Sequence, residues 1–221
     1  MLCIMKKKIA IMQPYFAPYA GYFRLFSQTD LFVIYDCVQF PRRGWVHRNK
    51  LPDASGESQW LTMPIKKCSQ STKIYDLEFS DSANQLWMEQ CKQFPSIIKA
   101  NHEIKDLIYR LDKNPLDYIV KLLKFVCEGV GINFNVEHSS SLNIPDEIKG
   151  QDRIIEIAKY FQATDYVNSP GGKDLYNESA FKKEGINLHF LPEYKGNNWS
   201  MLHRLITEDP KKILEEINAN S

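Results

Sequence analysis

The residue types of a phosphate-binding or group-transfer site are concentrated in one short stretch of the sequence. QFPRRGWVHRNKL, residues 39–51, holds three arginines, an indole, a histidine and two side-chain amides. Guanidinium groups donate paired hydrogen bonds that fit phosphate oxygens. The alternative is a solvated basic loop. We predict ligand or phosphate contacts here for Gln39, Arg42, Arg43, Trp45, Arg48 and Asn49.

Three polar residues are candidates for catalysis. Asp36 directly follows an apolar run at residues 31–35, where it can act as a base, accept a hydrogen bond from a sugar hydroxyl, or pair with Arg42 or Arg48. Gln13 follows the apolar run at residues 8–12, and a polar side chain at a buried strand end needs a partner. His47 lies inside the basic stretch. We predict catalytic roles for these three side chains.

The turn that follows the apolar run at residues 8–12 predicts an anion site. A helix that begins beside a strand end offers unpaired backbone N–H groups and partial positive charge. Gly21 would let a ligand approach that backbone closely. Tyr19 and Tyr22 flank the glycine and are predicted to contact the ligand, with simple core packing as the alternative for the rings of this stretch.

Turns after other predicted strands supply further candidate ligand contacts. Hydroxyl groups, glycine backbone and lysine side chains are the groups involved, although a Gly-Gly pair more often marks only a turn. The residues are Lys66, Ser139, Ser140, Ser169, Gly171, Gly172 and Lys173.

The elements that must position these residues alternate between strand and helix. Strands are predicted at residues 8–12, 30–36, 60–65, 73–79, 133–137, 164–168 and 187–191. Helices are predicted at residues 21–28, 82–99, 101–112, 115–130, 151–161 and 209–218. The first two strands are apolar throughout, as is typical of strands covered on both faces.

This alternation predicts an α/β fold with a Rossmann-like, mainly parallel sheet and helices on both faces. We expect a single α/β domain over residues 1–221, with a helical insert at residues 82–131. Ligands of such sheets bind beyond the carboxyl ends of the strands. Gln13, Asp36 and Ser169 are therefore expected to converge on one cleft.

Composition excludes several classes of protein. A formal net charge of +1 gives no overall attraction to nucleic acid or to an anionic membrane. The five cysteines form no CxxC pair, which favours free thiols in a reducing, cytoplasmic location. No histidine pair has metal-ligand spacing, and no apolar run is long enough to span a membrane. We predict no structural metal and no membrane span; the oligomeric state stays open.

Four blocks in this order resemble the WbqC-like protein family: IAIMQPYFAPYAGYF, DLFVIYDCVQFPRRGWVHRNKL, SSSL and YVNSPGGKDLY. The resemblance covers nearly the whole chain. It implies a role in bacterial surface-polysaccharide synthesis, chiefly of the O-antigen of lipopolysaccharide. It implies a pathway rather than a defined reaction.

The N-terminal part is also similar, more weakly, to nucleotidyltransferase-like α/β enzymes such as pantothenate synthetase. Those enzymes carry a His-x-Gly-His signature that opens the first helix and contacts ATP phosphates. Tyr19-Ala20-Gly21-Tyr22 stands at the same place here, and both histidines are absent. Phosphate contact through imidazole groups is therefore not carried over.

Together these features predict a group-transfer enzyme that acts on a nucleotide-linked or phosphorylated sugar. The reaction would be nucleotidyl transfer, or acyl or aminoacyl transfer to an amino sugar. The alternative is a non-catalytic sugar-nucleotide-binding or assembly protein of the same pathway. The cofactor is undefined, and any metal would arrive with a nucleotide as Mg²⁺.

Overall fold

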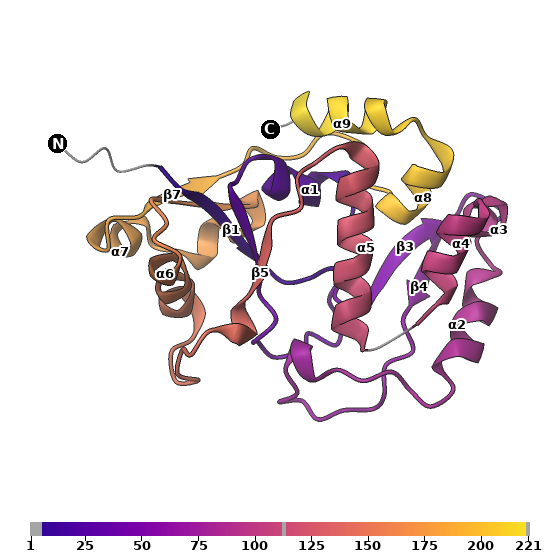
Figure 1. Ribbon diagram of the computed structural model, residues 1–221, viewed down its shortest axis with the longest axis horizontal. Helices are drawn as coiled ribbons and strands as arrows, with labels where there is room; N and C mark the ends of the chain where they lie inside the picture. The colour runs from indigo at the N-terminus through magenta and orange to yellow at the C-terminus, as the bar shows by residue number, and fades with distance from the viewer. Residues whose placement is uncertain (1–5, 112–113, 220–221) are drawn as a thin grey trace.

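A five-stranded sheet forms the centre of the computed structural model, which describes residues 6–111 and 114–219 (Figure 1). Its strands are β1 (Lys8–Met12), β2 (Leu31–Ile34), β5 (Val136–His138), β6 (Asp165–Asn168) and β7 (Asn187–Phe190). They lie in the order β5-β2-β1-β6-β7, and each pairing is parallel. The predicted parallel sheet is confirmed, with β1 between β2 and β6. Residues 1–5 lie outside the described residues.

Helices cover both faces of the sheet, as predicted. They are α1 (Ala20–Ser27), α5 (Pro115–Val130), α6 (Gly150–Tyr160), α7 (Glu178–Lys183) and α9 (Pro210–Ala219). Ile9 and Ile11 of β1 belong to the apolar cluster that includes residues of α6 and α7. Ala10, between them, belongs to the cluster of α1, α5 and α9. Successive side chains of a strand point to opposite faces, so β1 is buried on both sides.

A hairpin and four further helices lie beside the sheet. The hairpin pairs β3 (Arg48–Pro52) with β4 (Ser58–Thr62) in antiparallel fashion. Figure 1 shows α2 (Ala83–Cys91), α3 (Pro95–Lys99) and α4 (His102–Tyr109) next to this hairpin, away from β1. The last of the four, α8 (Met201–Thr207), precedes α9. The division into a single domain with an insert at 82–131 stays a prediction.

Some predicted elements differ from the observed ones. Residues 73–79 do not form a strand: Ile74–Asp76 is a short 3₁₀ helix with one isolated bridge on either side. Its backbone forms local hydrogen bonds, such as Asp76 N to Lys73 O at 3.1 Å, instead of the ladder of hydrogen bonds between two strands. The helix predicted at 82–99 breaks before α3, because Pro95 has no N–H to continue α2. The basic stretch also contains β3, which had been expected to be loop.

The end of α5 gives a first test of local geometry. Gly131 caps this helix with φ of +79° and has no atom within 4 Å of the position of a Cβ. Gly131→Ala should therefore lower the free energy of unfolding by roughly 1 kcal/mol, because an L side chain is strained in this region. Urea denaturation measures the change. Gly171→Ala is the control, since Gly171 has the same open space without a positive φ; an equal loss there would contradict the argument.

Candidate functional site

The turn that follows β1 is held by side chains from two distant parts of the chain. Asn49 Nδ2 donates to the carbonyl oxygens of Phe16 at 3.0 Å and Ala17 at 2.7 Å. Ser200 Oγ donates to the same Ala17 oxygen at 2.6 Å. Ala17 has φ of +40°, a conformation that L residues rarely adopt. These hydrogen bonds fix the turn in that conformation.

Backbone hydrogen bonds tie the same three segments together. Phe16 N donates to Trp45 O at 2.9 Å, and Met201 N donates to Pro18 O at 3.0 Å. Tyr19 forms an isolated bridge with Ser200. The turn after β1, the stretch before β3 and the start of α8 are therefore one packed unit.

A cavity of about 480 Å³ opens beside this unit, and we call it the aromatic pocket. It is lined by Tyr15, Pro18, Tyr19, Trp45, Asn49, Lys50, Ser58, Asn197, Asn198 and Trp199. Four aromatic side chains and one lysine face it, and no carboxylate lines it. Its walls come from loops that follow β1 and β7 and from the hairpin. It thus lies where loops leave the carboxyl ends of parallel strands, the usual place for a ligand.

Cations and indoles stack at the edge of the aromatic pocket. The Trp45 and Trp60 ring centroids are 5.3 Å apart. Arg48 Cζ lies 4.2 Å from the Trp60 centroid, and Lys50 Nζ lies 5.1 Å from it. Trp45 is 43% exposed, so one ring of this group remains available to a ligand. An exposed aromatic face can stack on a nucleobase or pack against a sugar ring.

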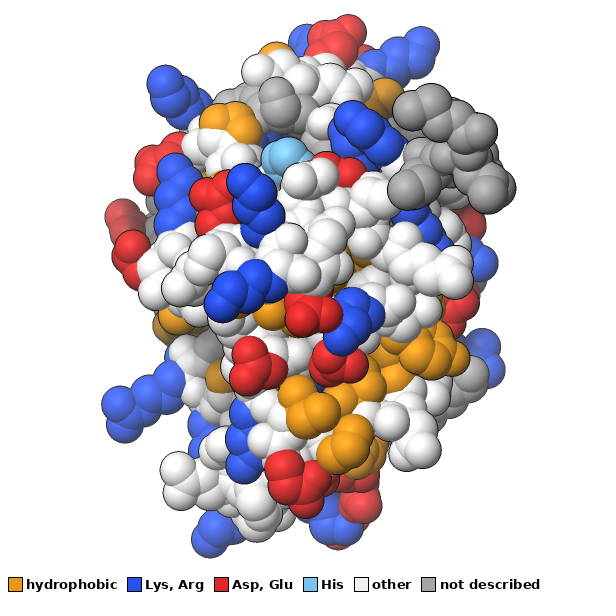
Figure 2. All heavy atoms as spheres, turned by 90° about the vertical axis from the view of Figure 1, so that its left-hand side faces the viewer, with side chains coloured by type: hydrophobic (Ala, Val, Ile, Leu, Met, Phe, Trp, Pro, Cys, Tyr) orange, Lys and Arg blue, Asp and Glu red, His pale blue; other side chains and the backbone are white. Residues whose placement is uncertain are grey.

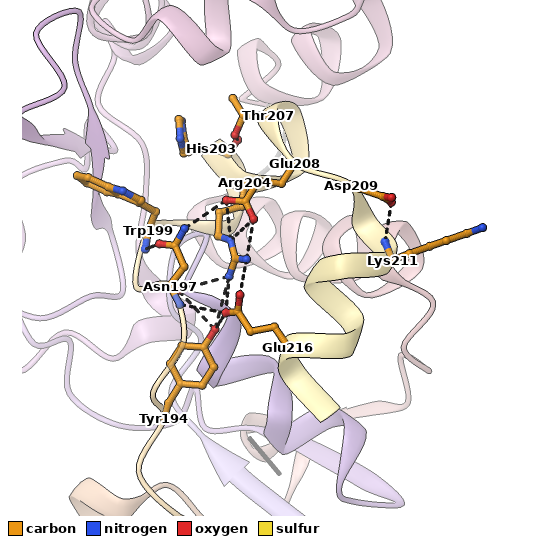
Figure 3. A network of polar contacts seen from close by, with 10 residues as sticks. All are labelled: Tyr194, Asn197, Trp199, His203, Arg204, Thr207, Glu208, Asp209, Lys211 and Glu216. Carbon is orange, nitrogen blue, oxygen red and sulfur yellow. Dashed lines mark hydrogen bonds and ion pairs between the residues drawn. The ribbon is translucent and has the colours of Figure 1, made fainter. Parts of the chain in front are cut away.

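The wall at residues 194–199 is fixed by a buried ion network (Figure 3). Arg204 is 2% exposed, and its guanidinium binds Glu208 through Nη2 at 2.7 Å and Glu216 through Nη2 at 2.8 Å. Burial lowers the pKa of Arg204, but the hydrogen bonds of the two carboxylates outweigh it and raise that pKa. Asn197 N donates to Glu216 Oε1 at 3.0 Å, and Trp199 N to Asn197 Oδ1 at 2.9 Å. The network therefore holds two pocket residues in place.

Asp36 lies at the end of β2, fully buried and surrounded by hydrogen-bond donors. Ser139 Oγ donates to it at 2.9 Å, Ser140 N and Oγ each at 2.8 Å, and His138 Nδ1 lies 2.7 Å away. Burial raises the pKa of Asp36, but these hydrogen bonds outweigh it and lower that pKa. The alternative in which Asp36 pairs with Arg42 or Arg48 is wrong, because its donors come from β5 and the turn after it. The hydroxyl groups of Ser139 and Ser140 both donate hydrogen bonds to this carboxylate.

Arg42, His47 and Lys66 line a different cavity, of about 370 Å³. Arg42 Nη2 donates to Cys68 O at 2.6 Å, and Lys66 pairs with Glu78 at 2.8 Å. Burial, with a smaller contribution from Arg48, lowers the pKa of His47 to about 4. His47 is therefore neutral at pH 7. Gln39 lines a third cavity, of about 430 Å³.

The remaining predicted residues have other surroundings. Gly21 is covered rather than open: a Cβ there would collide with the Tyr19 ring and lie 2.8 Å from Tyr194 Cγ. Tyr22 is a core residue, and its hydroxyl donates to Gln13 O at 2.9 Å. The other predicted residues do not line the aromatic pocket: Arg43, Ser169, Gly171, Gly172 and Lys173. The convergence of Gln13, Asp36 and Ser169 on one cleft stays a prediction, although β2, β1 and β6 are neighbours.

The part of the chain that the structure describes contains neither a membrane-spanning helix nor a metal-binding cluster. No helix there has the length and apolar character needed to cross a bilayer. No three histidine, cysteine or carboxylate side chains gather there in a way that could hold a metal ion.

A family model described as the WbqC-like protein family matches residues 13–204. The chain belongs to this family. An uncharacterized protein of Mycobacterium tuberculosis, Rv1507c, is 27% identical over 207 residues, covering 86% of this chain and 84% of that protein. No solved structure matches the chain. The matched range contains every residue that lines the aromatic pocket.

Sequence reasoning placed only part of the aromatic pocket of this WbqC-like protein. Tyr19, Trp45 and Asn49 were predicted to contact ligand and do line it. Tyr15 lies in the turn after β1 and Lys50 in the basic stretch, but neither was among the residues predicted to contact ligand. Residues 197–199 gave no signal, because long-range bonds place that loop. Ser200 and Met201 bond to the turn after β1, and Glu216 and Arg204 hold Asn197.

Asn49 of the WbqC-like protein should be important for folding. Asn49→Ala removes the Nδ2 donor from the carbonyl oxygens of Phe16 and Ala17, of which Ala17 keeps the Ser200 hydroxyl. We expect the free energy of unfolding to fall by about 1–3 kcal/mol in chemical denaturation. Asn198→Ala removes an exposed amide from the same pocket and should have little effect on stability. Equal stability of both variants and wild type would contradict the clamp role of Asn49.

The Asp36–His138 pair should make stability depend on pH. The hydrogen bond to Asp36 raises the pKa of His138, against a smaller opposing effect of burial. A raised folded-state pKa stabilises the protein fully below the unfolded value, 6.5, and the contribution is lost as pH rises through the folded value. The difference in unfolding free energy between wild type and His138→Gln should therefore shrink from pH 6 upward.

Urea titrations across this pH range measure that difference. His102→Gln is the control, because His102 is paired with Asp106 on an exposed helix surface and should contribute little at any pH. A difference for His138→Gln that grows with pH would show that the sign is wrong.

Proposed function

We propose that this WbqC-like protein binds a nucleotide-linked or phosphorylated sugar in the aromatic pocket and transfers a group to or from it. The pathway, bacterial surface-polysaccharide and chiefly O-antigen synthesis, rests on the family resemblance. The ligand class rests on the pocket. The reaction would be nucleotidyl transfer, or acyl or aminoacyl transfer to an amino sugar.

The observation that carries this proposal is the composition of the pocket wall. Four aromatic side chains surround about 480 Å³, a volume typical of small-molecule sites. The exposed face of Trp45 suits a sugar ring or a base. Lys50 adds a cation, and the exposed Ser58 and Asn198 can bond to hydroxyls. The Asn49 amide is already used by the turn after β1.

A group transfer to a hydroxyl or amine needs a base for the proton that is released. Asp36 is surrounded by donors, which suits it to orienting His138 rather than to meeting a substrate itself. His47, neutral at pH 7, stays a candidate for the base. Gln13 stays a predicted catalytic residue in another role, because an amide does not take up a proton. Because β2 and β5 are neighbours, Asp36 and His138 lie at the same edge of the sheet as the turn after β1.

A non-catalytic sugar-nucleotide-binding protein is the second candidate. The observation in its favour is that the predicted catalytic residues do not share the aromatic pocket: His47 lines another cavity and Asp36 is buried. A cytoplasmic location is part of either proposal. It is supported by the four described cysteines, which are unpaired. Figure 2 shows acidic and basic side chains interspersed on one face, which does not favour nucleic acid as the partner of that face.

Titration calorimetry with a panel of nucleotide sugars tests the pocket, and mass spectrometry of the same mixtures tests turnover. Trp45→Ala should weaken binding roughly 5- to 100-fold, since stacking on one aromatic residue contributes about 1–3 kcal/mol. Tyr160→Ala removes another exposed ring, on α6, and should bind as wild type does.

Arg43→Ala is the third arm of this titration. Arg43 was predicted from the sequence to bind phosphate, yet it does not line the aromatic pocket. A loss of affinity in Arg43→Ala with none in Trp45→Ala would move the site to the basic stretch. Binding without turnover in wild type would favour the binding protein over the enzyme.

A further inference from the structure

Arg24 of α1 is buried, and no carboxylate of the described residues pairs with it. It is 1% exposed, and its Nη2 donates to Pro192 O at 2.7 Å. Its Nε is buried and has no hydrogen-bond partner. Its guanidinium carbon lies 5.8 Å from the centroid of the Tyr194 ring. A carbonyl and a ring face compensate a buried charge only in part, so this arrangement costs stability.

Arg204 shows how the same chain treats a buried arginine that serves the fold. It is equally buried, at 2% exposed, and it binds both Glu208 and Glu216. Both arginines contact Tyr194, so they share one neighbourhood. The protein supplies two carboxylates to one arginine and none, among the described residues, to the other.

The position of Arg24 relates it to the aromatic pocket. The Tyr194 ring that faces Arg24 lies 5.3 Å from the Tyr19 ring, and Tyr19 lines the pocket. Both rings pack against Gly21 in the first turn of α1, where a Cβ would not fit. Arg24 thus lies directly behind the tyrosine pair at the pocket wall.

The charged side chain that lines the pocket is positive, and the nearby carboxylates of Glu208 and Glu216 are paired with Arg204. Lys50 lines the pocket, and no aspartate or glutamate does. The first turn of α1 contains no acidic residue, and no side chain caps its N-terminus at Tyr19. Helix N-termini favour anions. A buried arginine, a pocket lysine and an uncapped helix end therefore attract negative charge to the Tyr19 side of the pocket.

We propose that the ligand of the aromatic pocket is an anion, and that its phosphoryl or carboxylate group lies at the Tyr19 side, where Arg24 and Lys50 supply the positive charge. This inference rests on the proposed function, because it takes the aromatic pocket as the binding site. It adds the place of the ligand's charged group and assigns the charge recognition to Arg24 and Lys50 rather than to the arginines of residues 42–48.

Arg24→Met separates this role from a structural one. Methionine keeps an aliphatic chain that can fill the space and removes a charge that the fold does not compensate. The melting temperature of the ligand-free variant should stay equal to that of wild type or rise. A cation that serves the fold, as Arg204 does, would instead leave the variant far less stable.

The binding experiment uses four probes: glucose, glucose 1-phosphate, glucuronate and inorganic phosphate. Wild type should bind an anionic probe more tightly than glucose, and salt should weaken that binding. Arg24→Met and Lys50→Met should each lose about tenfold in affinity for the anionic probe and little for glucose. Lys182→Met, which removes one exposed positive charge from α7, should bind as wild type does. The preferred anion tells phosphoryl from carboxylate recognition.

Three results would overturn the inference. The first is that wild type binds glucose more tightly than every anionic probe. The second is that Arg24→Met and Lys50→Met bind the anionic probes as tightly as wild type does. The third is a large drop in the melting temperature of Arg24→Met together with an unchanged anion affinity in Lys50→Met. Trp45→Ala distinguishes the two proposals. If it weakens all sugar probes while the charge variants do not, the pocket is the binding site and only its charge recognition is wrong.

Discussion

The carbonyl oxygen of Ala17 is the point on which the site depends. It accepts hydrogen bonds from Asn49 and Ser200, which lie on the hairpin and at the start of α8. Ala17 adopts a positive φ that is unfavourable for an L residue, so the turn needs these partners. The aromatic pocket is walled by the same three segments that meet at this turn. It should therefore exist only in the fully folded protein.

The two buried arginines show a division between stability and binding. Arg204 joins α8 to α9 through Glu216, pairs with Glu208 at the end of its own helix, and fixes the loop that carries Asn197 and Trp199. Arg24 contributes a charge that the fold leaves largely uncompensated. Uncompensated charge is unfavourable in a folded protein and is retained where a ligand can pair with it. The contrast between the two residues carries more information than either one alone.

The sequence predicted the sheet better than the site, for physical reasons. The apolar run of β1 is typical of a strand buried on both faces, and this pattern is local. Asn49 was predicted to contact ligand and lines the aromatic pocket, but its amide is bonded to carbonyls 32 and 33 residues away, which no local pattern reveals. The loop at 197–199 reaches the pocket through the bonds of Ser200 and Met201 to the turn after β1 and through the Arg204 network. The run at 73–79 looks apolar enough for a strand, yet single bridges and local turns satisfy its backbone.

The alternation of side chains along β3 explains why the basic stretch is not one site. Arg48 and Lys50 point to the same side of the hairpin and both stack on Trp60. Asn49, between them, points to the opposite side and is buried against the turn after β1. A continuous run of polar residues in the sequence therefore becomes two groups with different tasks. One face of β3 holds the turn in place, while the other presents cations and an indole beside the aromatic pocket, so neighbouring substitutions on this strand should affect either folding or binding, but rarely both.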